Sequence, residues 1–274
     1  MISISKLFLF TVCAHNIIAN NWNPKEYEKS NIEQFNYATK ELLKLNLNGN
    51  ESVLDIGSGD GKVSMHIAKN YLPNGTLTGI DNNQAMVEFA QNANKLSNAS
   101  FEFGNATTYT SDKAYDVVLS FWTLHWTTDY IATISNIAKL LKHGGKTLLC
   151  HVIKSDKNQL DRLTKELLEL PEWNIYKSLY KTELNEPAIE TVIEAIRKAN
   201  LDIENIEIKK NGAWMPVKLL KQNLLSTPLF NFIPLEHRDK FINQYLDKLS
   251  LESEFNDKGE IYHWLPVIIL VLKK

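Results

Sequence analysis

The stretch VLDIGSGDG (residues 53–61) and the stretch LTGID (residues 77–81) decide the fold of this chain. The first is a short apolar run that reaches Asp55 and continues into three glycines at alternate positions. The second is another apolar run, which ends at Asp81. Short apolar runs of this kind are typical of strands buried in a parallel sheet. Together they predict a strand, a tight glycine turn, a helix and a second strand, with a carboxylate near the end of each strand.

The alternation of strands and helices continues along the chain and predicts right-handed βαβ units. We therefore expect an α/β fold of the doubly wound, Rossmann-like kind, with a seven-stranded, mostly parallel sheet, an antiparallel last strand and a helical insertion or lid. The predicted strands span 52–56, 76–80, 100–103, 116–121, 146–153, 203–210 and 260–272. The predicted helices span 31–47, 62–70, 83–95, 129–141 and 186–199, and 216–250 is predicted to be mostly helical.

The 274 residues are enough for one large domain with an insertion. We expect a single domain over 22–274, in which 50–153 bind a cofactor and the segments 22–48, 154–185 and 213–258 form the substrate side and lid. Residues 1–21 are interpreted as an N-terminal extension or a signal-like segment. Their apolar run is too short to span a bilayer, and no membrane span is expected.

The composition excludes several classes of function. The formal net charge is −2, so a surface that follows nucleic-acid phosphates is not expected. The two cysteines cannot form a disulfide framework, and no cluster of residues has the spacing of a metal site. These observations favour a small-molecule partner and leave the oligomeric state open.

The glycine turn favours S-adenosylmethionine over a dinucleotide as the cofactor. Lys62 stands where a dinucleotide-binding turn would place its last glycine. Asp55 and the turn can hold the amino-acid end of the cofactor, and Asp81 can accept hydrogen bonds from both ribose hydroxyls. Asn105 can pair with the adenine ring. The expected cofactor-binding residues are Asp55, Gly57, Ser58, Gly59, Asp81, Asn82, Asn105, Ala106 and Ser120. Because S-adenosylmethionine is a cytosolic metabolite, we expect a cytoplasmic protein, with export as the minority alternative.

The order and spacing of these motifs, with GNA at 104–106 and YDVVLSFWTLHW at 115–126, resemble the class I S-adenosylmethionine-dependent methyltransferases. The stretches YEKSNIEQ (27–34) and SFWTLHW (120–126) are similar to the juvenile hormone acid and trans-aconitate methyltransferases. That resemblance implies O-methylation of a carboxylic acid, with Gln34 and Trp126 binding the substrate carboxylate. The chain departs from the family at two positions, with Asn105 in place of the common aspartate and Ser58 in place of cysteine or another small residue.

The predicted chemistry depends on the nature of the methyl acceptor. An ionised carboxylate is already a nucleophile, so it needs placement by neutral donors rather than a general base. A hydroxyl or amine acceptor would need a base, and His125 is the candidate. The alternatives are methylation of a malonyl group on a carrier protein, a binding module that senses S-adenosylmethionine without turnover, and a nicotinamide dehydrogenase.

Overall fold

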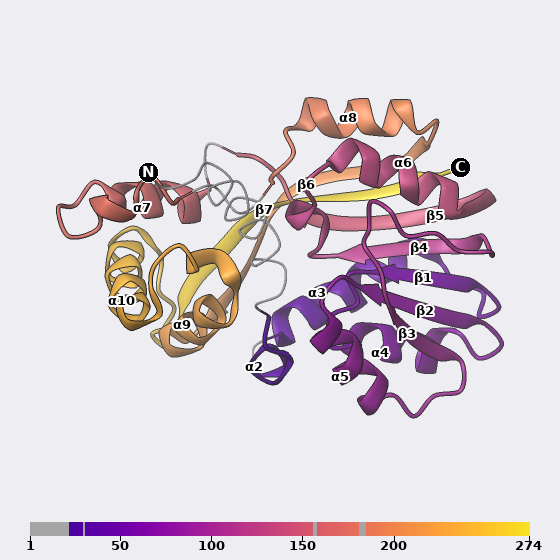
Figure 1. The fold of residues 1–274 in the computed structure, drawn as a ribbon, viewed down its shortest axis with the longest axis horizontal. Helices are drawn as coiled ribbons and strands as arrows, with labels where there is room; N and C mark the ends of the chain where they lie inside the picture. The colour runs from indigo at the N-terminus through magenta and orange to yellow at the C-terminus, as the bar shows by residue number, and fades with distance from the viewer. Residues whose placement is uncertain (1–21, 30, 156–157, 181–184) are drawn as a thin grey trace, which may run out of the picture.

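The computed structural model describes residues 22–29, 31–155, 158–180 and 185–274, so the expectations for residues 1–21 lie outside the described part (Figure 1). Seven strands form one sheet in the order β3-β2-β1-β4-β5-β7-β6. The strands are β1 (Ser52–Ile56), β2 (Thr76–Asp81), β3 (Ala99–Phe103), β4 (Tyr115–Phe121), β5 (Leu141–Val152), β6 (Asp202–Met215) and β7 (Ile261–Lys273).

The strand directions confirm the predicted doubly wound fold. Strands β3, β2, β1, β4 and β5 are parallel, and β7 is antiparallel to both of its neighbours, β5 and β6. Strand order reverses at β1, which pairs with β2 on one side and β4 on the other. In such sheets the crevice at the carboxyl ends of the strands beside this reversal is the usual ligand site.

Helices cover both faces of the sheet because neighbouring side chains of each strand point to opposite faces. Val53 of β1 packs in the cluster with α3 and α4, whereas Leu54 packs in the cluster with α6 and α8. The helices around the sheet are α2 (Pro24–Glu28), α3 (Ile32–Leu42), α4 (Lys62–Tyr71), α5 (Gln84–Ala93), α6 (Tyr130–Leu140) and α8 (Ile189–Lys198).

A separate helical cap extends from the sheet, at the left of Figure 1. It comprises α7 (Gln159–Leu168), η3 (Asn174–Tyr176), α9 (Val217–Ser226), η4 (Pro228–Phe230) and α10 (Leu235–Glu252), with the outer ends of β6 and β7. Met215 and Ile261, at the ends of these two strands, share one apolar cluster with the cap helices. The helical insertion predicted after β5 is therefore one part of a larger cap.

Three element boundaries differ from the sequence predictions by five residues, and the other boundaries differ by less. The helix predicted over 31–47 ends at Leu42 and continues as the 3-10 turn η1 (Leu43–Leu45), because Asn46 takes the left-handed conformation that ends a helix. Strand β5 begins five residues before the predicted 146 because Leu141 already pairs with Tyr115 of β4. Strand β6 continues past the predicted 210 to Met215, because its pairing with β7 extends into the cap.

Candidate active site

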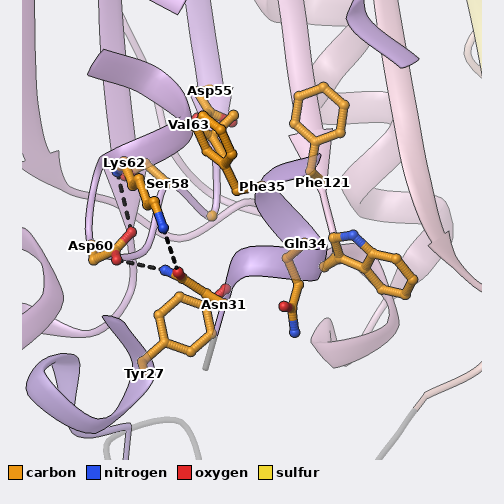
Figure 2. A pocket seen from close by; sticks show the side chains of 12 residues that line it. Tyr27, Asn31, Gln34, Phe35, Asp55, Ser58, Asp60, Lys62, Val63 and Phe121 are labelled. Carbon is orange, nitrogen blue, oxygen red and sulfur yellow. Dashed lines mark hydrogen bonds between the residues drawn. The ribbon is translucent and has the colours of Figure 1, made fainter. Parts of the chain in front are cut away.

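A cavity opens at the carboxyl ends of β1 and β4, beside the point where strand order reverses (Figure 2). The cavity and the open solvent at its mouth together contain about 400 Å³ of space that no atom fills. The N-terminal helices form one wall, and the glycine turn and the end of β4 form the others. Its lining residues are Tyr27, Asn31, Gln34, Phe35, Asp55, Gly57, Ser58, Asp60, Lys62, Val63, Phe121 and Trp122.

Two positions of the turn favour glycine for different reasons: Gly57 has no room for a Cβ, and Gly59 has a positive φ. The N–H groups of Gly57 and Ser58 both donate to the Ile80 carbonyl of β2, at 2.8 and 2.9 Å. A Cβ on Gly57 would lie 2.0 Å from the Thr123 hydroxyl oxygen, so no larger residue fits there. Gly59 has a φ of 55°, which favours glycine, although the space beside it is open. The turn predicted from the sequence is therefore present, and its backbone faces the cavity.

Asp81 lies at the end of β2 beside this turn, although it is not among the residues that line the cavity. One carboxylate oxygen accepts the Gly59 N–H at 3.0 Å, and the other accepts the Asn83 N–H at 2.9 Å. Each oxygen of a carboxylate can accept a second hydrogen bond, so both can still accept a ribose hydroxyl. Burial raises the pKa of Asp81, although the hydrogen bonds from the two backbone N–H groups act in the opposite direction. The neighbouring Asn82, also predicted to bind cofactor, is exposed.

Three carboxylates gather around the cavity and favour a cationic ligand. Burial is the main cause that raises the pKa of Asp55 to about 6. The Ser64 hydroxyl donates a hydrogen bond to the Asp55 carboxylate and opposes the rise, whereas the negative charge of Asp81 adds to it. Burial also raises the pKa of Asp60. The pKa of the Tyr27 phenol is raised by burial and then by the negative charges of Asp60, Asp81 and Asp55. A bound cation would stabilise the ionised carboxylates.

The N-terminal helix α3 is held against the site at both of its ends. At the first end, Asn31 donates to Asp60 at 2.6 Å and accepts from the Lys62 ammonium at 3.1 Å, as the dashed lines of Figure 2 show. At the other end, the buried carboxylate of Glu41 accepts from Lys209 of β6 at 2.7 Å. Sequence reasoning missed Asn31 and Asp60, although Asp60 sits inside the glycine turn.

The residues predicted to meet the adenine lie beside Asp81 but outside the cavity lining. Strand β3 pairs Phe103 with Asp81, which places the following Asn105 at the same edge of the sheet. The Asn105 side chain is exposed and accepts the Thr107 N–H at 2.9 Å, and Ala106 is buried. Ser120 is fully buried and donates its hydroxyl to the Ile56 carbonyl at 2.9 Å. Their contacts with a cofactor stay predictions.

The three predicted catalytic residues are in different environments. Gln34 lines the cavity, and within the described part of the chain its buried side-chain oxygen has no hydrogen-bond partner. Trp126, in η2 (Leu124–Trp126), is not among the lining residues. Its ring packs edge-on against Trp22, with ring centres 5.7 Å apart, and against the cap cluster. Direct contact of Trp126 with a substrate stays a prediction.

His125 is buried beneath this region in a setting that weakens it as a base. Its Nδ1 accepts the Val152 N–H at 3.4 Å, so in the neutral ring the proton lies on Nε2. Burial, and secondly the neighbouring His151, lower the pKa of His125 to about 3. The imidazole is therefore neutral at pH 7 and takes up a proton poorly.

Comparison with known proteins identifies the family. The profile of a methyltransferase-domain family matches residues 47–211, more than half of the chain. This chain belongs to that family. The predictions of a class I S-adenosylmethionine-dependent methyltransferase and of its cofactor are therefore confirmed.

The relatives agree with this assignment. Methyltransferase 235L of Invertebrate iridescent virus 6, a provisionally named protein, is 26% identical over 230 residues, which are 82% of this chain and 84% of the relative. The juvenile hormone acid O-methyltransferase of Bombyx mori is 25% identical over 207 residues, 72% and 73% of the two chains. The trans-aconitate 2-methyltransferase of Methylobacterium radiotolerans is 28% identical over 125 residues, 46% and 47% of the two chains.

Solved structures share the fold. The YcgJ protein of Bacillus superposes with a TM-score of 0.61 at 17% identity, over 87% of this chain and 98% of that one. Phosphoethanolamine N-methyltransferase 2 of Haemonchus contortus, solved with S-adenosylhomocysteine, gives the same TM-score and identity over 92% of this chain and 57% of that one. Similarity at this level of identity concerns the fold alone.

The described residues contain neither a candidate metal site nor a helix able to cross a membrane. Within them, no three histidine, cysteine or acidic side chains are grouped so that they could hold a metal ion. No helix in the described ranges combines the length and the hydrophobicity needed to cross a bilayer.

Proposed function

We propose that this methyltransferase transfers the methyl group of S-adenosylmethionine to a carboxylate of a small or medium-sized organic acid. The observation that carries the proposal is the Gln34 amide, which lines the cavity and whose buried oxygen has no partner in the ranges that the structure describes. Rotation of the amide about its last bond presents its N–H₂ group instead, so that it can donate to an acceptor oxygen. The resemblance of residues 27–34 and 120–126 to carboxylic acid methyltransferases supports the same role.

The charges of the cavity suit both ligands. The cofactor supplies a methyl group on a cationic sulfur, and Asp55, Asp81 and the turn at Gly59 are the groups that would hold it. Among the described lining residues, Lys62 is the single cation, and it is engaged with Asn31 and lies 5.2 Å from the centre of the Phe35 ring. An acid substrate would therefore be held by neutral donors, which position one oxygen without neutralising the other.

This arrangement needs no general base, because the ionised carboxylate is the nucleophile. The enzyme contributes placement in line with the methyl–sulfur bond and exclusion of water by the N-terminal helices. Methyl transfer to a hydroxyl or an amine would need a proton acceptor, and the buried, weakly basic His125 argues against that chemistry. Dependence on a cytosolic metabolite also supports a cytoplasmic location.

Methyl transfer from labelled S-adenosylmethionine to a panel of acceptors tests the proposal. The panel contains trans-aconitate, farnesoic-type acids, malonyl thioesters with and without a carrier protein, and matched alcohols and amines. We expect the label to appear in a methyl ester of one of the acids, from which mild alkali releases labelled methanol. Label that resists alkali and appears only with alcohols or amines would refute the proposal. Tight cofactor binding without any product would indicate a sensor module.

A further inference from the structure

Trp122, the first residue after β4, has a backbone conformation that is unusual for its size. Its φ is 58°, in the left-handed region. The other non-glycine residues with positive φ in the described ranges are Asn46 and Asn200, and asparagine tolerates this conformation better than bulky residues do. The backbone N–H of Trp122 donates to the Cys150 carbonyl of β5 at 2.8 Å, and this hydrogen bond holds the strained backbone in place. Strain of this kind is concentrated at functional sites.

The indole of Trp122 lines the cavity, and its side-chain N–H is buried without a hydrogen-bond partner among the described residues. A buried donor without a partner is costly, and indole N–H groups usually find one. Trp173 in the cap shows the usual arrangement, since its indole donates to Gln244 at 2.5 Å. The Trp122 ring is fixed on its other side by Tyr37 of α3, with ring centres 5.3 Å apart.

We infer that Trp122 binds the methyl acceptor, its indole N–H donating a hydrogen bond to a carboxylate oxygen of the acid while Gln34 contacts the same group. The inference rests on the proposed function, because an N–H that can only donate requires a ligand with an acceptor oxygen. A hydrogen bond to an ionised carboxylate is stronger than one to a neutral acceptor. Two neutral donors, one from α3 and one from the end of β4, hold the carboxylate without a competing positive charge.

The resemblance implies the same role for a different residue, Trp126. Both indoles belong to the same short segment after β4, and either could be expected to reach a substrate from the sequence alone. Trp122 lines the cavity, whereas Trp126 packs between Trp22 and the cap cluster. Its place in the cavity lining favours Trp122 as a donor to the acid, while contact of Trp126 with a substrate stays a prediction.

The first test observes the indole N–H groups by NMR in the ¹⁵N-labelled full chain saturated with S-adenosylhomocysteine. The six tryptophans give six indole resonances, and the one missing from Trp122→His identifies Trp122. Addition of an acid that the enzyme methylates is expected to move this resonance downfield. An acid that is methylated without moving the Trp122 resonance would overturn the inference and leave the proposed function intact. If no acid is methylated at all, the proposed function itself has failed.

The second test compares the kinetics of two variants. Trp122→Phe keeps an aromatic ring without the donor, and KM for the acid is expected to rise about tenfold or more while S-adenosylhomocysteine affinity stays within about twofold. Trp122→His retains a ring N–H and suits positive φ, so it is expected to recover part of the loss. Trp214→Phe, at an exposed site on β6, is the matched control. A Trp122→Phe enzyme with an unchanged KM, or a Trp122→His enzyme no better than it, would overturn the inference.

Discussion

Replacing Gly57 with alanine should destabilise the protein by more than the same change at Gly144, and the difference measures the collision inside the glycine turn. Both glycines have nearly the same φ, 77° and 78°, so the conformational penalty of about 1–2 kcal/mol is shared. At Gly144 a Cβ would meet no atom within 4 Å. At Gly57 it would lie 2.0 Å from the Thr123 hydroxyl oxygen and 2.6 Å from the Thr123 Cβ, so backbone must move.

Overpacking of this kind costs roughly 1–3 kcal/mol in addition. We therefore expect the free energy of unfolding to fall by about 2–5 kcal/mol in Gly57→Ala and by about 1–2 kcal/mol in Gly144→Ala. Urea denaturation of both variants measures it. The Gly57 variant should also bind S-adenosylhomocysteine more weakly, because the shifted turn moves Gly59 relative to Asp81. Equal losses of stability in the two variants would refute the reasoning. If the added change Thr123→Ser restored the stability of the Gly57→Ala variant, the reasoning would also be refuted, because serine keeps the Cβ that already blocks the space.

Three other changes test the site. Asp81→Asn should weaken S-adenosylhomocysteine binding about tenfold to a hundredfold by calorimetry, because charged acceptors of the ribose hydroxyls are lost; an unchanged affinity would exclude Asp81 as a ligand. The pKa of Asp55 is raised from 3.8 to about 6, so protonation of Asp55 stabilises the folded chain; this stabilisation is complete below pH 3.8 and is lost as pH rises through about 6. Asp55→Asn should therefore flatten the dependence of the free energy of unfolding on pH, measured by urea titration. The affinity of the parent for the cofactor should fall below pH 6, as the Asp55 carboxylate that faces the cation becomes protonated, and a pH-independent affinity would contradict this role. His125→Asn should lower stability by about 1–3 kcal/mol without changing the pH profile of kcat between pH 6 and 8; loss of an acidic limb from that profile would show that His125 acts as a base.

The cofactor side of the site could be predicted because its signals are local. Asp55 and Asp81 each stand near the end of a short apolar run, and parallel strands bring such ends to one edge of a sheet. The glycines between them mark a turn whose conformation only glycine adopts easily. Asp60 lies in the same turn, but its buried contact with Asn31 depends on how α3 docks, and no local pattern indicates that contact.

The substrate side could be predicted only in outline, because it is built from segments far apart in the sequence. The cap combines helices that follow β5 with helices between β6 and β7, and their shared apolar cluster appears only in three dimensions. The motif at 120–126 holds two tryptophans four residues apart, and the resemblance pointed to Trp126. The positive φ of Trp122, which accompanies its place in the cavity lining, is not visible in the sequence.

Calorimetric titration of the full chain with S-adenosylhomocysteine and, separately, with NAD tests the central claim most directly. The glycine turn and its buried carboxylates predict saturable binding of S-adenosylhomocysteine at one site per chain and no binding of NAD. No heat with S-adenosylhomocysteine, or equal affinity for NAD, would contradict the account.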